Sequence, residues 1–523
     1  MDWPLDRERL AKLDEQGIPR YELIAKTIEG AIVSGHLRSG ERMFTVRQFA
    51  EQLGVSGTTV AAAYNLLSQK GWIRSEVGRG TFVTSPEIGG GFSSAPKAPS
   101  RLVHARAGAP VFGHSFQKSR VGVAAVPWRR RALMSSATRL RAAYPKLADC
   151  STGRPDPTLL PLELLQRAFR KAIDSTPHIE LQYAGAETVD FLAKQLVSRL
   201  DMDSVFVRPG ELVVASSAQQ LMVLTLQIVA AAAGSSEITV AVENPGYPTI
   251  FDTYERAGYR LAGVEVDAHG AVPESLDAAL RGGAAAVLLT PRAHNPTGAS
   301  WSVERMSLLV DVIAAHPQVI VIEDDHFAGI TTTRPGSLLS DSRVEDRIVY
   351  IRSFSKSIAP DLRIAVAAVR PRLRTLLMEA KTFADGWTSR LTQRTLAWIL
   401  ADEELDPLLT RAALAYAERR TVTARELHQM LGPLGGNAWS GSDGVNIWVH
   451  LPSGLDSSHI VEQAASLGVL VAPGEPFFIR PGRGDVLRIN AGAMSVERSA
   501  EIGQIVARAA LTEAETTVHA IPV

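Results

Sequence analysis

Lys356 is the residue best placed for covalent chemistry. It follows the apolar run Ile348–Arg352, hydroxyl side chains precede it at Ser353 and Ser355, and Arg363 comes seven residues later. Hydroxyls and a guanidinium around an amine at a strand end suit an amine that bonds an aldehyde while its neighbours hold a phosphate. Because a lone lysine is usually a solvated surface charge, this interpretation depends on the rest of the chain.

Four other segments carry groups that such a site needs, and each follows an expected strand. Ser216–Gln220 opens a helix, whose free N–H groups and dipole suit a phosphate. Glu243–Pro248 places an aromatic ring in a turn, where it can stack on a pyridine. His294–Gly298 offers an amide to a phenolic oxygen, and Glu323–His326 offers a carboxylate that keeps a pyridine nitrogen protonated.

Each of these segments alone also has an ordinary structural interpretation. Residues 295–298 can form an ordinary turn, the aspartates of Glu323–His326 can cap a helix, and Tyr247 can belong to the core. Arg488 can form a structural ion pair. Five such features in this order, each at a strand end, are far less expected by chance. Together they predict pyridoxal phosphate (PLP), bonded to Lys356 as a Schiff base.

The elements that must position these groups can be read from the pattern of apolar residues. From about residue 149 onward, helical patterns alternate with short apolar runs, which predicts an α/β fold with a mainly parallel sheet. The expected strands are Glu211–Ala215, Ile238–Val242, Ala286–Thr290, Val319–Glu323 and Ile348–Arg352. The longest apolar run, Leu221–Ala233, is shorter than the roughly 20 residues that span a bilayer, so we interpret it as a buried helix.

The N-terminal segment has a different pattern. Residues 21–34 place aliphatic side chains on one helical face, and Gly35 ends that helix. A second helix is expected at about Val46–Leu53, and Ser56 can cap a third helix at about Gly57–Lys70. Residues 72–83 have the pattern of two strands around a glycine-rich tip. This arrangement predicts a helix-turn-helix with a wing.

Residues 20–84 resemble the GntR family of winged-helix regulators through GHLRSGERMFTVRQFAEQLGVSGTTVAAAYNLLSQKGWI and the wing GRGTFV. The resemblance implies that the third helix enters the major groove. The DNA-contacting residues it implies are Arg47 for backbone phosphate, Ser56, Thr58, Thr59 and Tyr64 on or near the DNA face, and Arg79 for the minor groove. Two positions depart from the family: Met43-Phe44-Thr45 replaces the usual Leu-Pro-Ser, and Gly57 stands where a cation is frequent.

The segment from about residue 149 to residue 511 resembles the fold-type-I aminotransferases. The complete arrangement, a GntR-type domain followed by an aminotransferase-like domain, resembles the MocR subfamily of regulators. This resemblance implies that Lys356 is the Schiff-base lysine and that Asp324 pairs with the pyridine nitrogen. Asn295 would bond the phenolic oxygen, and Tyr247 would stack on the ring. The phosphate ligands that it implies are Ser217, Ala218, Gln219, Ser353, Ser355 and Arg363. Arg488 would bind the carboxylate of an amino-acid effector, and Tyr183 would reach the phosphate of a partner in a head-to-tail homodimer.

Three features depart from the pattern of that subfamily. His326 stands where a tyrosine usually bonds the phenolic oxygen; an imidazole can still donate, but its charge switches near neutral pH. Ser217 replaces a usual glycine, and Glu187–Leu192 replaces a usual Gly-x-x-x-Leu-Arg pattern. These changes leave the effector open and make efficient catalysis less expected.

Composition and the two resemblances together imply three parts: a winged helix-turn-helix at 1–84, a flexible basic linker at 85–148, and a PLP-binding effector and dimerisation domain at 149–523 with a smaller C-terminal α+β subdomain. Residues 86–149 contain 11 Lys or Arg but two acidic residues, and they open with a glycine and serine run that is typical of linkers. We expect this linker to add contacts to DNA phosphates.

Cys150 is the single cysteine, which excludes an internal disulfide and suits a reducing cytoplasm.

The sequence therefore favours a cytoplasmic transcription regulator that binds double-stranded operator DNA and responds to PLP or to a small amino compound. No metal and no membrane contact are expected. Two alternatives remain: a working aminotransferase with an accessory DNA-binding module, and a regulator that no longer binds the cofactor. Multiple-turnover transamination with a 2-oxo acid distinguishes the aminotransferase from the regulator. A visible imine absorption band of the purified protein excludes a regulator that no longer binds the cofactor.

Overall fold

The computed structural model describes residues 19–33, 37, 40–69, 72–76, 80–83, 128–333 and 336–519. The chain divides into two compact units, residues 1–115 and 116–523, and each is described by itself. Arg79 of the expected wing and residues 85–127 of the expected linker lie outside the described residues.

The first unit contains the helices and strands that the sequence predicts. They are α2 (Arg20–Val33), α3 (Val46–Leu53), α4 (Gly57–Gln69), β1 (Ile73–Glu76) and β2 (Gly80–Val83). Thr45 begins α3: its hydroxyl accepts from the Gln48 N–H at 3.3 Å, while the Gln48 side chain accepts from the Thr45 N–H at 3.1 Å. This reciprocal pair is a capping box, which fixes where the helix starts. Gly54, at φ 67°, ends α3 in a left-handed conformation that suits glycine.

Tyr64 belongs to the core of this unit. Its side chain is 6% exposed, and its hydroxyl donates to the Phe44 carbonyl at 2.8 Å. The ring also packs against Phe49, with 6.2 Å between ring centroids. Burial raises the pKa of the Tyr64 hydroxyl far above its usual value. The expectation that Tyr64 lies on the DNA face is therefore wrong, because α4 turns this residue inward.

The second unit is built on a seven-stranded sheet with the order β4-β12-β11-β10-β9-β5-β6. The strands are β4 (Leu212–Ala215), β5 (Thr239–Glu243), β6 (Arg260–Val264), β9 (Ala284–Leu289), β10 (Ile320–Asp325), β11 (Ile348–Ser353) and β12 (Ala365–Val369). β12 is antiparallel to β11 and β4, whereas the other neighbours within the sheet are parallel. The predicted α/β fold with a mainly parallel sheet is confirmed.

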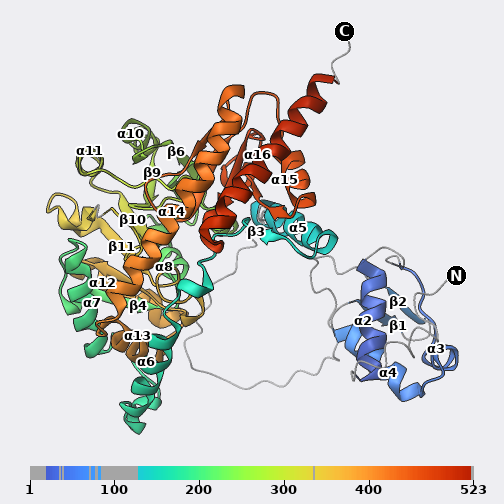
Figure 1. Cartoon of the computed structure of the whole chain (residues 1–523). Coiled ribbons are helices and arrows are strands. Elements are labelled where there is room, and N and C mark those ends of the chain that lie inside the picture. Colours follow the sequence, from blue (N-terminus) through green and yellow to red (C-terminus); the bar gives the residue numbers. More distant parts are fainter. Residues whose placement is uncertain are drawn as a thin grey trace. The chain divides into compact units, whose positions relative to one another are not determined.

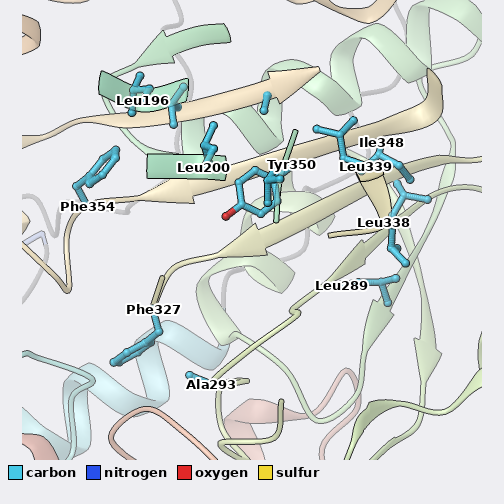
Figure 2. Packing of buried hydrophobic residues seen from close by; sticks show 14 of the residues in the cluster. Leu196, Leu200, Leu289, Ala293, Phe327, Leu338, Leu339, Ile348, Tyr350 and Phe354 are labelled. Atoms are coloured by element: carbon cyan, nitrogen blue, oxygen red, sulfur yellow. The ribbon is translucent and has the colours of Figure 1, made fainter. Parts of the chain in front are cut away.

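Helices cover both faces of this sheet, so its strands are buried on both sides. Successive residues of β11 alternate between two cores: Ile348 and Tyr350 lie in one, Val349 and Ile351 in the other. Figure 2 shows Tyr350 and Ile348 among the side chains of the first core, which also contains Leu196. The helices over the sheet are α6 (Leu162–Asp174), α7 (Asp190–Met202), α8 (Ala218–Ala232), α9 (Pro248–Arg256), α10 (Pro273–Arg281), α11 (Val303–Ala315), α12 (Pro371–Ala384) and α13 (Arg390–Leu400).

The apolar run expected as a buried helix is α8. Leu221, Leu224 and Leu226 on this helix are almost fully buried in the second core. None of the described helices is both long and apolar enough to cross a membrane.

A smaller antiparallel sheet with the order β13-β14-β17-β16 forms the C-terminal subdomain. Its elements are β13 (Asn437–Trp439), β14 (Asn446–His450), β16 (Ala472–Pro473), β17 (Val486–Asn490), α15 (Ser457–Ser466) and α16 (Val496–His519). The long helix α14 (Leu405–Leu431), orange in Figure 1, belongs to both subdomains. Leu405 and Tyr416 lie in the core of the large sheet, whereas Leu427 and Leu431 lie in the core of the small one.

The expected linker needs one correction. Within it, residues 128–143 form helix α5 (Trp128–Ala143), and Ala148–Asp149 form β3, which pairs with β15 (Val469–Leu470). Arg129 is fully buried and binds Asp252 and Glu255 of α9. This stretch is therefore not a flexible tether, because its first helix is held against the body by a buried ion pair.

Candidate cofactor site and DNA interface

A pocket of about 360 Å³ opens where the carboxyl ends of β5, β9, β10 and β11 meet the start of α8. In open α/β sheets, ligands bind at this edge. The expected cofactor and effector residues lining it are Ser217, Ala218, Gln219, Tyr247, Asn295, Asp324, His326, Ser353, Ser355, Lys356, Arg363 and Arg488. The fold thus brings together segments that are more than 250 residues apart in the chain.

The amine of Lys356 lies in this pocket beside Gly153, which is another of the lining residues. Its Nζ donates to the carbonyl of Gly153. Burial, reinforced by the positive charge of Arg488, lowers the pKa of the amine to about 8, while Asp324 opposes the shift. The lowered pKa increases the neutral fraction of the amine, which is the nucleophilic form, near neutral pH. Phe354 is buried in the core shown in Figure 2 and anchors the loop that carries Lys356.

Asp324 has an unpaired buried oxygen. Its Oδ1 finds no hydrogen-bond partner, while its Oδ2 lies 3.5 Å from Nδ1 of His326. Burial raises the pKa of Asp324, and the charges of His326 and Lys356 act against that rise. A buried carboxylate oxygen without a donor is costly. A protonated pyridine nitrogen would supply the missing donor.

Two backbone turns carry the expected phosphate ligands at one end of the pocket. Ser217 caps α8, and its hydroxyl accepts from the Gln220 N–H at 3.1 Å, so Ala218 and Gln219 lie in the first helical turn. Backbone N–H groups there have no partner within the helix. On the other turn, the Ser353 hydroxyl accepts from the Ser355 N–H at 3.3 Å. Exposed Arg363 adds a positive charge at the pocket wall.

Arg488 is almost fully buried and faces Asn295. Its Nη1 lies 3.4 Å from Oδ1 of Asn295, its Nη2 donates to the carbonyl of Ser151, and its Nε has no hydrogen-bond partner. The guanidinium packs over the ring of Phe477, 5.0 Å from the centroid. Burial lowers the pKa of Arg488 to about 10, so it remains a cation at neutral pH. Such a preformed cation suits a carboxylate.

Tyr183 does not lie in this pocket. Its side chain is 90% exposed, and its ring meets that of Trp387 edge to face at 5.7 Å between centroids. The pocket of a single chain therefore contains every expected cofactor residue except this one.

These residues fit pyridoxal phosphate as a set. The amine of Lys356 suits its aldehyde, the orphaned oxygen of Asp324 suits its ring nitrogen, and the first turn of α8 with Arg363 suits its phosphate. Tyr247 is 43% exposed and lines the pocket, and its aromatic ring suits stacking on the pyridine ring.

The second candidate surface lies on the first unit. Arg47 and Thr58 are exposed, and Thr59 is partly exposed, at the starts of α3 and α4. The Ser56 hydroxyl contacts the hydroxyls of Thr58 and Thr59 at 2.7 and 2.8 Å. The N-terminal end of α4 thus presents a cluster of hydroxyl groups that can donate to or accept from base edges and phosphates.

Two families match this chain. The aminotransferase class I and II family covers residues 120–504, and the gntR family of bacterial regulatory proteins covers residues 20–83. The vitamin B6 salvage pathway transcriptional repressor PtsJ of Salmonella typhimurium is 32% identical, over 90% of this chain and 94% of its own. The probable rhizopine catabolism regulatory protein MocR of Rhizobium meliloti is 26% identical, over 77% and 76% of the two chains. This chain belongs to the MocR-type transcription regulators.

The body of this MocR-type regulator also has the fold of solved aminotransferases. LysN, the α-aminoadipate aminotransferase of Thermus thermophilus, is 24% identical, with a TM-score of 0.64 over 74% of this chain and 95% of its own. That structure contains N-(5'-phosphopyridoxyl)-L-leucine. Aminotransferases of class I and II, the family that covers residues 120–504 here, are PLP-dependent enzymes.

Sequence reasoning missed a pair of buried groups beside the cofactor residues of this regulator. Glu243 lines the pocket with one oxygen lacking a hydrogen-bond partner, and its other oxygen lies 3.4 Å from Nε2 of His294. Burial raises the pKa of Glu243 to about 8 and lowers that of His294 to about 3. Burial therefore favours the uncharged form of both groups. The sequence offered one indication of this pair: Glu243 ends one expected strand of the site, and His294 follows another.

Arg42 on the first unit was missed as well. It is exposed, and its guanidinium lies over Gly80, where an added Cβ would come within 2.9 Å of Nε. The guanidinium forms no ion pair with another described residue.

Proposed function

We propose that this chain regulates transcription by changing its operator affinity according to what occupies the pocket around Lys356. The occupant is PLP, alone or together with a small amino compound. The observation that carries the proposal is the set of groups in one pocket that match an aldehyde, a ring nitrogen, a phosphate and a carboxylate. The same chain carries a gntR-type DNA-binding domain.

When bound, PLP supplies an electrophilic aldehyde and an electron-withdrawing ring. In our proposal, Lys356 provides the amine, and Asp324 holds a proton at the ring nitrogen. Arg488 binds the carboxylate of the amino compound, which its buried cationic guanidinium favours. PtsJ, by its name, represses a vitamin B6 salvage pathway, which supports PLP itself as one signal.

We further propose that the protein acts in the cytoplasm as a head-to-tail homodimer on paired operator half-sites. Tyr183, Ile179 and Leu181 are 90%, 76% and 58% exposed, and apolar surface of this kind favours a protein contact. A second chain would bring Tyr183 to the phosphate end of its partner's pocket. Arg47, Ser56, Thr58 and Thr59 would face the DNA, with Arg79 of the wing expected in the minor groove.

The decisive experiment compares operator binding by apo-protein, by protein loaded with PLP, and by loaded protein with a panel of amino acids and amines. A ligand shifts an equilibrium only by its unequal affinity for the two states, so an active signal must change the operator Kd. Equal operator affinity under all these conditions, with PLP bound, would refute the proposal.

A working aminotransferase with an accessory DNA-binding module is the second candidate. The lowered pKa of Lys356 and the positioned Arg488 favour it, because both are features of an amine-transfer site. Incubation of loaded protein with an amino acid and a 2-oxo acid measures turnover. Many product equivalents per protein would establish the enzyme, whereas one equivalent or fewer supports the regulator.

A further inference from the structure

Arg129 is one of the most completely bound side chains in the second unit. It is fully buried, and its guanidinium uses all five N–H groups. Nε donates to the Phe478 carbonyl at 3.0 Å, and Nη1 donates to Asp252 at 3.0 Å and Glu255 at 2.6 Å. Nη2 donates to Glu255 at 3.1 Å and to the Ile479 carbonyl.

One set of these contacts leads to the cofactor side of the pocket. Asp252 and Glu255 lie on α9, and the residue that precedes this helix is Tyr247. Thr253 on the same helix accepts a hydrogen bond from the Gln219 side chain at 3.2 Å. Helix α9 therefore connects Arg129 directly to Tyr247, and through Thr253 to the turn that contains Gln219.

The other set leads to the effector side. The segment that gives its carbonyls to Arg129 includes Phe477, whose ring lies under the guanidinium of Arg488. This segment is also tied to the turn before α9, because Gly246 N–H donates to the Phe477 carbonyl at 2.8 Å and Ile479 N–H donates to Asn244 at 3.0 Å. Arg129 thus joins both walls of the pocket at one point.

Arg129 also has a special place in chain order. It is the second residue of α5, the first described helix that follows the DNA-binding domain. Its neighbour Arg130 contributes a backbone N–H to Asp252 at 2.8 Å. Any change in the spacing between α9 and residues 477–479 must therefore act on the start of α5, from which the chain leads back to that domain.

We propose that Arg129 is a positioning residue of the pocket, and that through it the occupancy of the pocket is coupled to operator affinity. This inference rests on the function proposed above. PLP and an effector carboxylate fix Tyr247 and Arg488 on opposite walls, and the five hydrogen bonds of Arg129 carry this ordering to α5. An arginine is needed because only its planar fork can bind two carboxylates and two carbonyls together.

The test uses the full-length protein, loaded or not loaded with PLP, with Arg129→Gln and Arg129→Lys beside Arg139→Gln. Arg139 is the matched control, since it lies on the same helix but forms an exposed pair with Glu462 at 2.6 Å. If loading changes the wild-type operator Kd by about 5- to 150-fold, the usual span of allosteric coupling, Arg129→Gln should reduce that ratio to below about twofold. It should still show the visible absorption band of bound PLP. Arg129→Lys should restore little, and Arg139→Gln should behave as wild type.

Retention of the full wild-type ratio by Arg129→Gln would overturn the inference while leaving the proposed function intact. Hydrogen exchange on the wild-type protein provides an independent test, needed if Arg129→Gln fails to fold or if operator affinity does not respond to loading. PLP should slow amide exchange at residues 128–134 as well as at 247–256. Slowing at 247–256 alone would mean that the pocket does not communicate with α5, and the coupling would be rejected.

Discussion

Asp324 and Asp325 are consecutive in the chain, yet their carboxyl groups lie on opposite faces of the central sheet. Asp324 faces the pocket that holds Lys356, whereas Asp325 accepts from Tyr350 at 2.6 Å and pairs with Arg292 at 2.8 Å on the other face. The alternation of side chains along β10 imposes this division. Two chemically identical residues therefore have different surroundings, one at the lining of the pocket and the other in a buried set of polar contacts.

The first prediction follows from this division. Asp324→Asn should weaken PLP binding by about 10- to 150-fold, since a hydrogen bond to a charged group contributes about 1.5–3 kcal/mol. Its melting temperature without PLP should hardly fall. Asp325→Asn should instead destabilise the fold by about 3–5 kcal/mol, as expected when a buried ion pair loses one charge. PLP titration and thermal unfolding of both variants check this, and equal effects of the two on PLP affinity would contradict it.

The second prediction concerns the attachment of the cofactor. Lys356→Ala should abolish the visible absorption band of the PLP-loaded protein, because no other amine lines the pocket among the described residues. Lys194→Ala, on an exposed position of α7, is the matched control and should keep the band. After borohydride treatment of wild-type protein, peptide mapping should find the label at Lys356. A label on another lysine would refute the assignment.

The third prediction is a pH dependence. The amine of Lys356 must be neutral to attack an aldehyde, and burial lowers its pKa to about 8. The rate at which apo-protein captures PLP should therefore rise with pH through about 8 and level off above it. Because the charge of Arg488 contributes to the lowering, Arg488→Gln should shift this midpoint to higher pH. Stopped-flow absorbance measures both profiles, and a rate that falls with rising pH would disprove the role of the amine.

The fourth prediction separates phosphate contacts from base contacts on the first unit. Replacement of Arg42 or Arg47 by Gln should lower the slope of log affinity against log salt by about 0.9 each, with the ranking of operator variants unchanged. Thr58→Ala should change that ranking. Tyr64→Phe should do neither and should only destabilise the unit, by about 0.5–1.5 kcal/mol, because it removes the hydrogen bond from the Tyr64 hydroxyl to the Phe44 carbonyl. Operator-binding isotherms across a salt series distinguish these outcomes.

The fifth prediction concerns Tyr183. Tyr183→Phe removes one hydroxyl, so it should weaken PLP binding modestly, by about fivefold, as the loss of one hydrogen bond of about 1 kcal/mol implies. Sedimentation should still show a dimer at micromolar protein. A monomeric wild-type protein with PLP bound would contradict the proposed contribution of this residue to its partner's pocket.

The sequence was enough to predict most of the fold because periodic apolar patterns determine which face of each element is buried. The strand that carries Asp324 lies within two residues of its expected bounds, and the helix that begins after Ser217 lies within three. β12 was not among the expected strands. It consists of alanines and valines, and such a composition does not indicate whether a strand is parallel or antiparallel to its neighbours. Burial of Tyr64 was also missed, since a tyrosine on a helix suits either a core or a surface.

The sequence was less informative about α5. The sequence pattern indicates a basic, solvated stretch that includes Trp128, Arg129 and Arg130. Charge composition describes only neighbouring residues, whereas the carboxylate partners of Arg129 lie more than 120 residues away in the chain. Glu243 and His294 were hidden for the same reason, since each looks like an ordinary polar residue until the fold buries it. Long-range burial of charge is the kind of information that a pattern of neighbouring residues does not contain.

Helix α14 makes the two subdomains of the body inseparable. Its 27 residues are long enough, at about 1.5 Å each, to contribute to both cores, and neither core is complete without it. Denaturant should therefore melt both in a single cooperative transition rather than in two steps. We expect that a chain broken between Tyr416 and Leu427 would lose both halves of the pocket together, because each half needs its part of this helix for its core.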